Sequence, residues 1–426
     1  MQVPDTGYVR SGDLRLAYQQ WGQGPRLLVV PALLSNMEVA WEHEYMLRIF
    51  DLLGRHVSVA QFDKRGIGLS DRPEEAPSLE ERIADIVAVM DELGWESTSL
   101  LGVSEGGAMA QLFAVTYPER VEKLVLHNTY APARYRTLVQ ERAEPGDPPI
   151  PHPREMWEGF ERLVEAWPEG VQEFVDWFMP SQSDNPSFRR WLGRLMRLSA
   201  SPRDFRRQVE SIWTLDPGDA PERITQPTLV AHVKGDLVLN VANGRALAAL
   251  IPDAEYVEVQ GDDHFSWVLS NWRDVVDPVL EFVTGGPVAT VATRRFATVL
   301  FTDIVDSTRR SADMGDAAWH ELIDRHDRLA RKIVDQHGGR VVKSTGDGLL
   351  VVFDVPGQGV DCGLALCAEL HHLGLEIRAG LHAGEVEVRD DFDISGIAVN
   401  LAARVEHAAR NGELWASSTV RDMMLG

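Results

Sequence analysis

The sequence of 426 residues contains only two cysteines, Cys362 and Cys367. They lie close together in an apolar stretch that is typical of a helix, where their side chains are badly placed for a disulfide. This scarcity of cysteine excludes a secreted scaffold held together by disulfides. The first residues also lack a basic stretch followed by an apolar run, so we expect no secretory signal and a protein of the reducing cytoplasm.

Positive charge is scarce as well. The chain has 42 Lys and Arg residues against 65 Asp and Glu residues, which gives a formal net charge of −23 at pH 7. A nucleic-acid site or an anionic membrane surface requires clustered basic residues, so we expect neither as a partner. No apolar run reaches the roughly 18 residues of a membrane-spanning helix, so we expect no membrane span.

The length and the order of the apolar segments predict more than one domain. Short apolar runs that read as buried strands occur at 27–30, 57–61, 98–101, 123–127 and 228–233. Amphipathic stretches between several of them predict an α/β domain over 1–283, with a mostly parallel sheet covered on both faces. Residues 132–222 interrupt this alternation and are rich in Trp, Arg and Pro, which favours a helical cap. Small residues at 284–294 favour a linker.

One of these strands is followed by a serine in the setting of a nucleophile. The motif Gly102-Val103-Ser104-Glu105-Gly106 precedes a helical stretch, and its glycines allow the tight turn that projects a serine from a sheet. Asp236 and His264 each follow a later strand, so the chain order is Ser, Asp, His. In that arrangement His264 would take the proton of Ser104, and Asp236 would orient the imidazole.

These residues resemble the α/β-hydrolase superfamily, and the segment 63–70 has the family's D-x-R-G-x-G-x-S form. The resemblance covers about 1–283 and implies an α/β-hydrolase fold with a helical cap. It places the oxyanion hole at the backbone N–H groups of Leu33 and Glu105, although Pro31-Ala32-Leu33 replaces the family's usual His-Gly. The Glu105 carboxylate beside the nucleophile would disfavour an oxyanion. The expected substrate is an ester-like, moderately apolar molecule, and the alternative is a domain that senses a small molecule.

The C-terminal part carries two aspartates in strand contexts. The apolar run FATVLFTDI contains Asp303 near its end, and the run RVVKSTGDGLLVVF reads as a hairpin with Asp347 in its turn. If the strands are neighbours, the two carboxylates form an oxygen site suited to Mg²⁺ or Mn²⁺. The segment after Asp303 opens a helix, whose N-terminus beside metal ions favours a polyphosphate. Asn400 and Arg404 follow at i, i+4 on one face of a helical stretch.

The motifs F-T-D-I, K-S-T-G-D-G and D-I-S-G-I-A-V-N-L-A-A-R together resemble the catalytic domain of class III adenylate and guanylate cyclases over 295–426. The resemblance implies an α+β ferredoxin-like domain that converts ATP into cyclic AMP and diphosphate by a two-metal mechanism. The metal ligands implied are Asp303, Asp347 and the Ile304 carbonyl. Asn400 would position the ribose, and Arg404 would stabilise the transition state.

The same resemblance bears on the base and on the assembly. Lys343 and Asp393 stand at the base-reading positions, where Lys donates to adenine N1 and Asp accepts from the N6 amine, so we expect ATP. Cyclase sites of this family form across a dimer interface. One protomer gives the metal aspartates and its partner gives Lys343, Asp393, Asn400 and Arg404, so we expect a C2 homodimer with two sites.

Three functions are consistent with these residues. The first is an adenylate cyclase whose hydrolase domain processes or senses a small molecule, which resembles two-domain cyclases of mycobacteria and related actinobacteria. The second is a serine esterase or lipase-like hydrolase with a degenerate or regulatory cyclase module. The third is a ligand-gated switch made of two non-catalytic domains. The sequence stops at Gly426, before the last strands usual in the cyclase family, so we expect the cyclase domain to be C-terminally incomplete.

Overall fold

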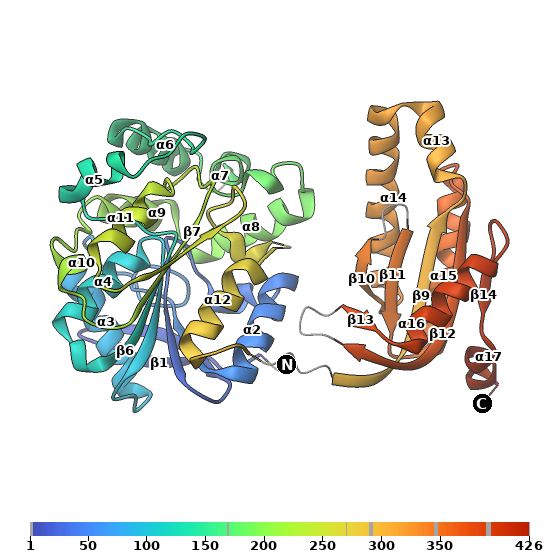
Figure 1. Ribbon diagram of the computed structural model, residues 1–426, viewed down its shortest axis with the longest axis horizontal. Coiled ribbons are helices and arrows are strands. Elements are labelled where there is room, and N and C mark those ends of the chain that lie inside the picture. Colours follow the sequence, from blue (N-terminus) through green and yellow to red (C-terminus); the bar gives the residue numbers. More distant parts are fainter. Residues whose placement is uncertain are drawn as a thin grey trace. The chain divides into compact units, whose positions relative to one another are not determined.

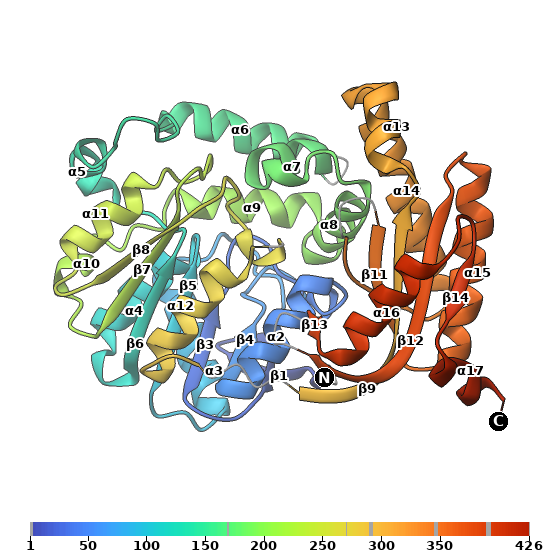
Figure 2. The same cartoon turned by 45° about the vertical axis from the view of Figure 1, so that its right-hand side comes forward.

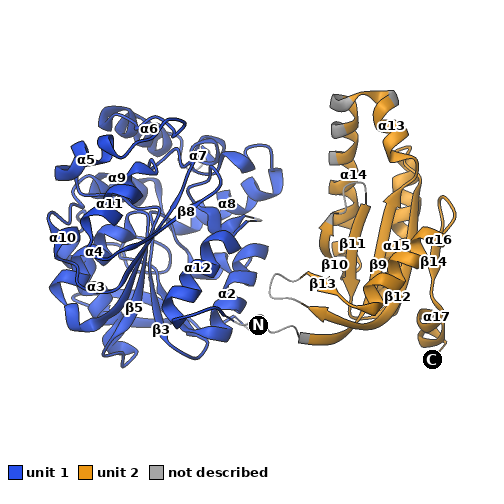
Figure 3. Cartoon of the chain, viewed as in Figure 1, with its two compact units in different colours: residues 1–288 blue, residues 289–426 orange. Residues whose placement is uncertain are grey.

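The computed structural model of the chain comprises two compact units, 1–288 and 289–426, which have separate colours in Figure 3. The structure describes residues 3–167, 170–269, 271–288, 293–344, 348–388 and 393–425. Each unit has its own sheet and its own buried cores, so each is described separately below.

Unit 1 is built on an eight-stranded sheet in the order β1-β2-β4-β3-β5-β6-β7-β8 (Figure 1). The strands are β1 (Gly7–Ser11), β2 (Leu14–Trp21), β3 (Arg26–Val30), β4 (Ser58–Phe62), β5 (Thr98–Val103), β6 (Val121–His127), β7 (Thr228–Val233) and β8 (Glu255–Val259). The first two pairings, β1–β2 and β2–β4, are antiparallel, and all the others are parallel. The five strands expected from apolar runs are present as β3 to β7. The β1–β2 hairpin was not predicted.

Helices cover both faces of this sheet, as Figures 1 and 2 show. They are α1 (Met37–Ala40), α2 (Glu44–His56), α3 (Leu79–Glu92), α4 (Gly106–Thr116), α11 (Ala242–Leu250) and α12 (Arg273–Thr284). In β5, Leu100 packs into the core under α3, α4 and α11, while its neighbour Leu101 packs into the core under α2 and α12. Alternate residues of one strand therefore enter different cores, which explains why the parallel strands read as continuous apolar runs.

A helical cap is inserted between β6 and β7. Its helices are α5 (Arg136–Glu141), α6 (Pro153–Glu165), α7 (Val171–Phe178), α8 (Pro186–Ser199), α9 (Pro202–Ile212) and α10 (Ala220–Arg223). Asn185 and Ser201 cap the N-termini of α8 and α9 with their side chains, and a proline follows each of them at the first helical position. Trp167 stacks on Phe205 at 3.9 Å between ring centroids, so part of the tryptophan content serves the core of the cap.

Unit 2 contains a sheet in the order β10-β11-β9-β12-β13, with β14 paired parallel to β12 and every other pairing antiparallel. The strands are β9 (Thr293–Ile304), β10 (Arg340–Ser344), β11 (Gly348–Phe353), β12 (Ile377–Val388), β13 (Ile394–Ser395) and β14 (Leu414–Ala416). The expected hairpin is β10–β11, and β11 lies beside β9 as expected. Because β9 begins at Thr293, the last two residues of the predicted linker belong to this strand.

The helices of unit 2 are α13 (Ser307–Met314), α14 (Asp316–Gln336), α15 (Pro356–His372), α16 (Ile397–Ala408) and α17 (Ser418–Met424). Side chains of α14, α15 and α17 share one core with the sheet, and Ala398 and Ala402 of α16 pack into the core on its other face. Cys362 and Cys367 both lie on α15 and are free thiols, as expected. Within the described residues, no helix combines the length and apolar character needed to cross a bilayer.

Candidate active sites

Ser104 lies in a strained turn between β5 and α4. Its φ of 54° is in the left-handed region, which a residue other than glycine seldom adopts. The glycines around it leave room for the turn, because a Cβ at Gly106 would come within 2.4 Å of the Val30 carbonyl oxygen. The backbone holds the turn in place, with Ser104 N donating to His127 O at 3.0 Å. The expected strand–turn–helix context of this serine is therefore present.

Ser104, His264 and Asp236 form a chain of hydrogen bonds. His264 Nε2 lies 2.9 Å from Ser104 Oγ, and His264 Nδ1 lies 2.7 Å from Asp236 Oδ2. Asp236 and His264 are fully buried, and Ser104 is 8% exposed. The other carboxylate oxygen of Asp236 accepts hydrogen bonds from the backbone N–H groups of Val238 and Leu239 at 2.8 and 3.0 Å. The three predicted residues, which come from distant parts of the chain, thus meet.

The Asp236 carboxylate is held in its charged form. Burial on its own would raise the pKa of Asp236, but the charge and hydrogen bond of His264 and the backbone donors outweigh burial and leave the pKa below its ordinary value. A charged Asp236 requires Nδ1 of His264 to carry a proton, which leaves Nε2 free to accept the Ser104 proton. The electrostatics therefore support a basic nitrogen facing the serine.

Two further buried histidines lie near His264 and were not predicted. Burial, assisted by the charges of His232 and His264, lowers the pKa of His127 to about 3. Burial also lowers the pKa of His232, whose Nε2 lies 2.7 Å from Leu239 O and 3.8 Å from Asp236 Oδ2. Both imidazoles are therefore neutral at pH 7 and do not displace His264 from Asp236. The sequence did hold a sign of them, because His127 and His232 each lie in an apolar run that was predicted to be a buried strand.

The Glu105 carboxylate is buried in a cluster with two basic side chains. Glu105 is 2% exposed and forms an ion pair with Lys64, while Arg82 Nη1 lies 3.7 Å from the same carboxylate oxygen. Burial lowers the pKa of Lys64 well below its ordinary value, with a further contribution from the charge of Arg82. Arg82 in turn donates to Gln208 and Ser211 on the cap. Burial lowers the pKa of Arg82 only to about 10, so its charge offsets the expected repulsion by Glu105. Sequence reasoning missed both basic neighbours of Glu105.

Replacement of Lys64 by methionine tests this cluster. Lys64→Met is expected to destabilise unit 1 by about 3 kcal/mol, because a buried carboxylate keeps only its more distant cation. Denaturant unfolding followed by tryptophan fluorescence measures the change. Combining Lys64→Met with Glu105→Gln removes both charges and is expected to recover most of the loss. Wild-type stability of the single variant would contradict the ion pair.

Leu33 and Glu105, predicted to supply the oxyanion hole, both line the cavity that contains Ser104. Within the described part of the chain, no acceptor is found for the backbone N–H of either residue. The cavity has a volume of about 310 Å³ and is lined mainly by apolar side chains, many of them from the cap, including Met156 and Phe160. The cap also contacts the catalytic loop directly, since His264 N donates to Phe178 O at 2.8 Å.

In unit 2, Asp303 lies at the end of β9, opposite Gly348 of β11 and Arg378 of β12. Asp347, the second predicted metal ligand, lies outside the described residues. Asp303 forms an ion pair with Arg378, and Arg378 Nε lies 3.6 Å from Glu406 Oε1 of α16. In the single chain, the Asp303 carboxylate is therefore paired with a guanidinium at this strand end. Arg378 was not predicted, although it is the one arginine in the run that forms β12, which contains no lysine.

The Ile304 side chain is buried in the core, so this residue could offer only its backbone carbonyl to a metal. The structure describes no group of three or more His, Cys, Asp and Glu residues placed to hold a metal ion, and this search did not cover Asp347. The helix expected after Asp303 is α13, which begins at Ser307. The structure therefore describes the position of only one carboxylate of the predicted metal pair, and the metal site stays a prediction.

The two predicted base-reading residues lie together. Lys343 on β10 and Asp393 just before β13 form an ion pair of 2.8 Å, although 50 positions separate them in the sequence. Asn400 and Arg404 are exposed on α16, on the side away from Ala398 and Ala402. In the described part of a single chain, no hydrogen bond or ion pair joins Asp303 to Asn400 or Arg404.

The folds and the two sites together define a hydrolase unit followed by a cyclase-like unit, and comparisons with known proteins agree. The chain belongs to the α/β-hydrolase fold family through residues 25–269, and residues 291–425 match the adenylate and guanylate cyclase catalytic domain. "Putative adenylate cyclase 3" of Rhizobium meliloti (strain 1021) is 30% identical over 141 residues, which are 31% of this chain and 24% of that protein.

Two further relatives resemble unit 1. 3-Oxoadipate enol-lactonase 2 of Acinetobacter baylyi is 25% identical over 255 residues, which are 60% of this chain and 88% of that protein. The crystal structure of a bromoperoxidase from Bacillus anthracis superposes with a TM-score of 0.55 at 20% identity, covering 66% of this chain and 99% of that one, which supports the fold alone. The chain spans between 17% and 37% of the length of four of the curated relatives that it matches.

Proposed function

We propose that the chain has two activities, an adenylate cyclase in unit 2 and a serine hydrolase in unit 1. The hydrogen-bonded chain from Ser104 through His264 to Asp236 carries the hydrolase proposal, because all three groups are within 2.9 Å of their partners before any substrate binds. The cyclase proposal rests on the family match and on the Lys343–Asp393 pair.

For the hydrolase, the reaction follows from the positions of the groups. His264 Nε2 takes the proton of Ser104 as Oγ attacks the carbonyl carbon of an ester, and the N–H groups of Leu33 and Glu105 donate to the oxyanion. The proton then passes from His264 to the leaving alcohol. A water molecule, deprotonated by His264, releases the acid and restores Ser104. The charged Asp236 stabilises the imidazolium that forms in both halves of the reaction.

The substrate class follows from the cavity of Ser104. Its lining is mainly apolar, with Met156, Phe160 and Trp213 contributed by the cap. A neutral ester or lactone with a moderately apolar body suits this lining, and the enol-lactonase relative supports a lactone or ester. A panel of short-chain nitrophenyl esters and simple lactones tests this class. Absence of turnover on the whole panel would favour the alternative, in which unit 1 senses a small molecule.

For the cyclase, we infer that ATP is converted into cyclic AMP and diphosphate in a homodimer. Asp303, Asp347 and the Ile304 carbonyl would hold Mg²⁺ or Mn²⁺, which would activate the ribose 3′-oxygen and neutralise the triphosphate. Arg404 would stabilise the charge that develops on the α-phosphate, and Asn400 would orient the ribose. The exposure of Asn400 and Arg404 on α16 supports their contribution to a site on a partner protomer.

Base selection depends on Lys343 and Asp393 in this proposal. Lys343→Ala is expected to lower kcat/KM for ATP by about 10- to 100-fold, because a hydrogen bond from a charged donor to the base is lost. Cyclic nucleotide formation from ATP and from GTP, measured side by side, tests the role. The rate with GTP should change much less than the rate with ATP. The control variant Lys332→Ala, at an exposed position of α14, should leave the rates with both nucleotides unchanged. An equal fall with both nucleotides would show that Lys343 does not read the base.

A further inference from the structure

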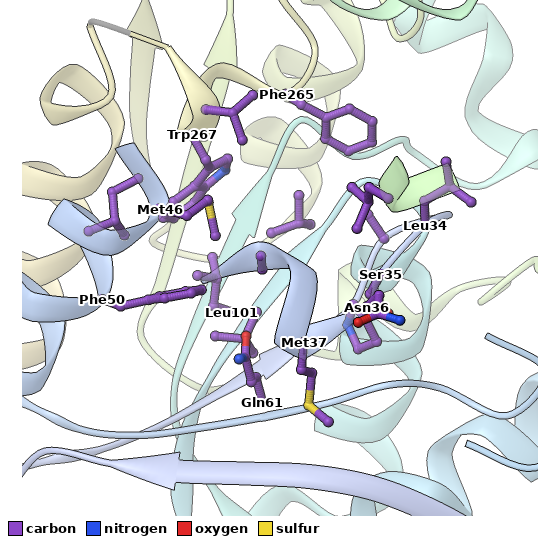
Figure 4. A pocket seen from close by; sticks show the side chains of 18 of the residues that line it. Leu34, Ser35, Asn36, Met37, Met46, Phe50, Gln61, Leu101, Phe265 and Trp267 are labelled. Atoms are coloured by element: carbon purple, nitrogen blue, oxygen red, sulfur yellow. The ribbon is translucent and has the colours of Figure 1, made fainter. Parts of the chain in front are cut away.

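Unit 1 contains a second cavity, with a volume of about 210 Å³, whose lining shares no residue with the cavity of Ser104. It lies between strands β3, β4 and β5, helices α1 and α2, and the cap helix α8. Figure 4 shows side chains converging on it, among them Met46 and Phe50 of α2 and Trp267 of the short turn Ser266–Val268. The cavity is therefore bounded by both the core of the unit and its cap.

The lining of this second cavity is mainly apolar. No lining residue that the structure describes is charged. Among the polar lining residues, Asn36 accepts from Val39 N and donates to Leu198 O, both at 3.1 Å. Gln61 donates to Gln19 at 2.9 Å. Ser35 Oγ and Trp267 Nε1 also line the cavity and are buried without a hydrogen-bond partner among the described residues, so a ligand could make one or two polar contacts there. With no charged residue in the lining and apolar side chains over most of it, contact with apolar side chains would still dominate the binding of a ligand.

The second cavity adjoins the site of Ser104 through three short backbone segments. Leu34, Val103 and Phe265 line the second cavity, while their sequence neighbours Leu33 and Ser104 line the first, and His264 bonds to Ser104. None of the three residues of the hydrogen-bonded chain lines the second cavity. A molecule held there would therefore be bound without being attacked, yet it would contact the segments that position the oxyanion hole and the base.

Protein interiors are packed with few voids larger than a water molecule, so a persistent apolar cavity of this size is unusual. Apolar cavities of about 150 Å³ already bind benzene. The cap helix α8 contributes Trp191 and Leu192 to the lining, and Trp191 Nε1 donates to Val39 O of α1 at 3.3 Å. We propose that this cavity is a binding site for a neutral, hydrocarbon-like small molecule of about the size of an alkylbenzene, distinct from the substrate of Ser104.

The test uses butylbenzene as the probe and the full chain as the protein, with binding measured by isothermal titration calorimetry. Met46→Trp fills the second cavity and is expected to raise the Kd at least about tenfold. Met156→Trp is the matched control, since it places the same larger side chain in the cavity of Ser104 and should leave the Kd unchanged. Met46→Phe fills less space and replaces Met46→Trp if circular dichroism shows that the latter does not fold.

The inference does not depend on hydrolase activity, so Ser104→Ala should bind butylbenzene with the wild-type Kd. Three results would overturn it. The first is no measurable binding to the wild-type chain. The second is an unchanged Kd when Met46 is enlarged. The third is loss of binding in Met156→Trp but not in Met46→Trp, which would place the probe in the cavity of Ser104.

Discussion

Ser104→Ala is expected to lower kcat for hydrolysis of a nitrophenyl ester by about 10⁴-fold or more. The substitution removes the attacking oxygen, and when residues act as one unit the loss of the nucleophile alone costs nearly as much as the loss of all three. Initial rates on the purified full chain measure the effect, with cyclic AMP formation by the same sample as evidence that the chain is folded.

A covalent readout makes this prediction sharper. A fluorophosphonate that reacts with activated serines should add one phosphonyl group to the wild-type chain and none to Ser104→Ala, as intact-mass spectrometry would show. Ser187→Ala, an exposed position at the start of α8, is the matched control and should react as the wild type does. Equal ester hydrolysis by Ser104→Ala and the wild type would remove Ser104 from the reaction.

Asp303→Ala and Arg404→Ala are each expected to abolish cyclic AMP formation, and an equal mixture of the two is expected to recover about a quarter of wild-type activity. The recovery follows from the symmetry of a shared site, because half of the dimers are then mixed and each mixed dimer keeps one of its two sites intact. Co-expression of the two variants with different tags, followed by a metal-dependent assay of ATP conversion, measures it.

The control for this experiment is a second mixture. Asp303→Ala and Asp347→Ala would remove groups that come from the same protomer, so every mixed dimer lacks an intact site and no activity should return. Recovery in this control, or no recovery with Arg404→Ala, would contradict the assignment of these residues to opposite protomers. The hydrolase test is unaffected by either outcome, since Ser104, His264 and Asp236 come from one unit of one chain.

Local sequence patterns predicted much of both units. Strands β3 to β7, the helical cap, the β10–β11 hairpin and its β9 neighbour follow from apolar periodicity and turn residues, which act over a few positions. The turn at Ser104 follows from its flanking glycines. The β1–β2 hairpin was missed because its two strands, at the antiparallel end of the sheet, carry more polar residues than the central strands.

Contacts between distant residues could not be derived in this way. Lys64 and Arg82 gave no local sign that they neutralise Glu105, and Arg378 gave none that it pairs with Asp303 across two strands. The pairing of Lys343 with Asp393 was expected only through resemblance to a family. In each case the interaction joins charged groups that are distant in the sequence, so the partners depend on how strands and helices are arranged in the fold.

The sequence by itself determined the class of each unit and the chemical groups available to it, because glycine turns, strand periodicity and spaced motifs are local properties of the chain. Only the tertiary structure decided the state of those groups. It brought Asp236 and His264 to Ser104, buried Glu105 beside two basic side chains, kept His127 and His232 neutral, and left two separate cavities under one cap. Burial and charge proximity are properties of the packed chain, and no short stretch of sequence contains them.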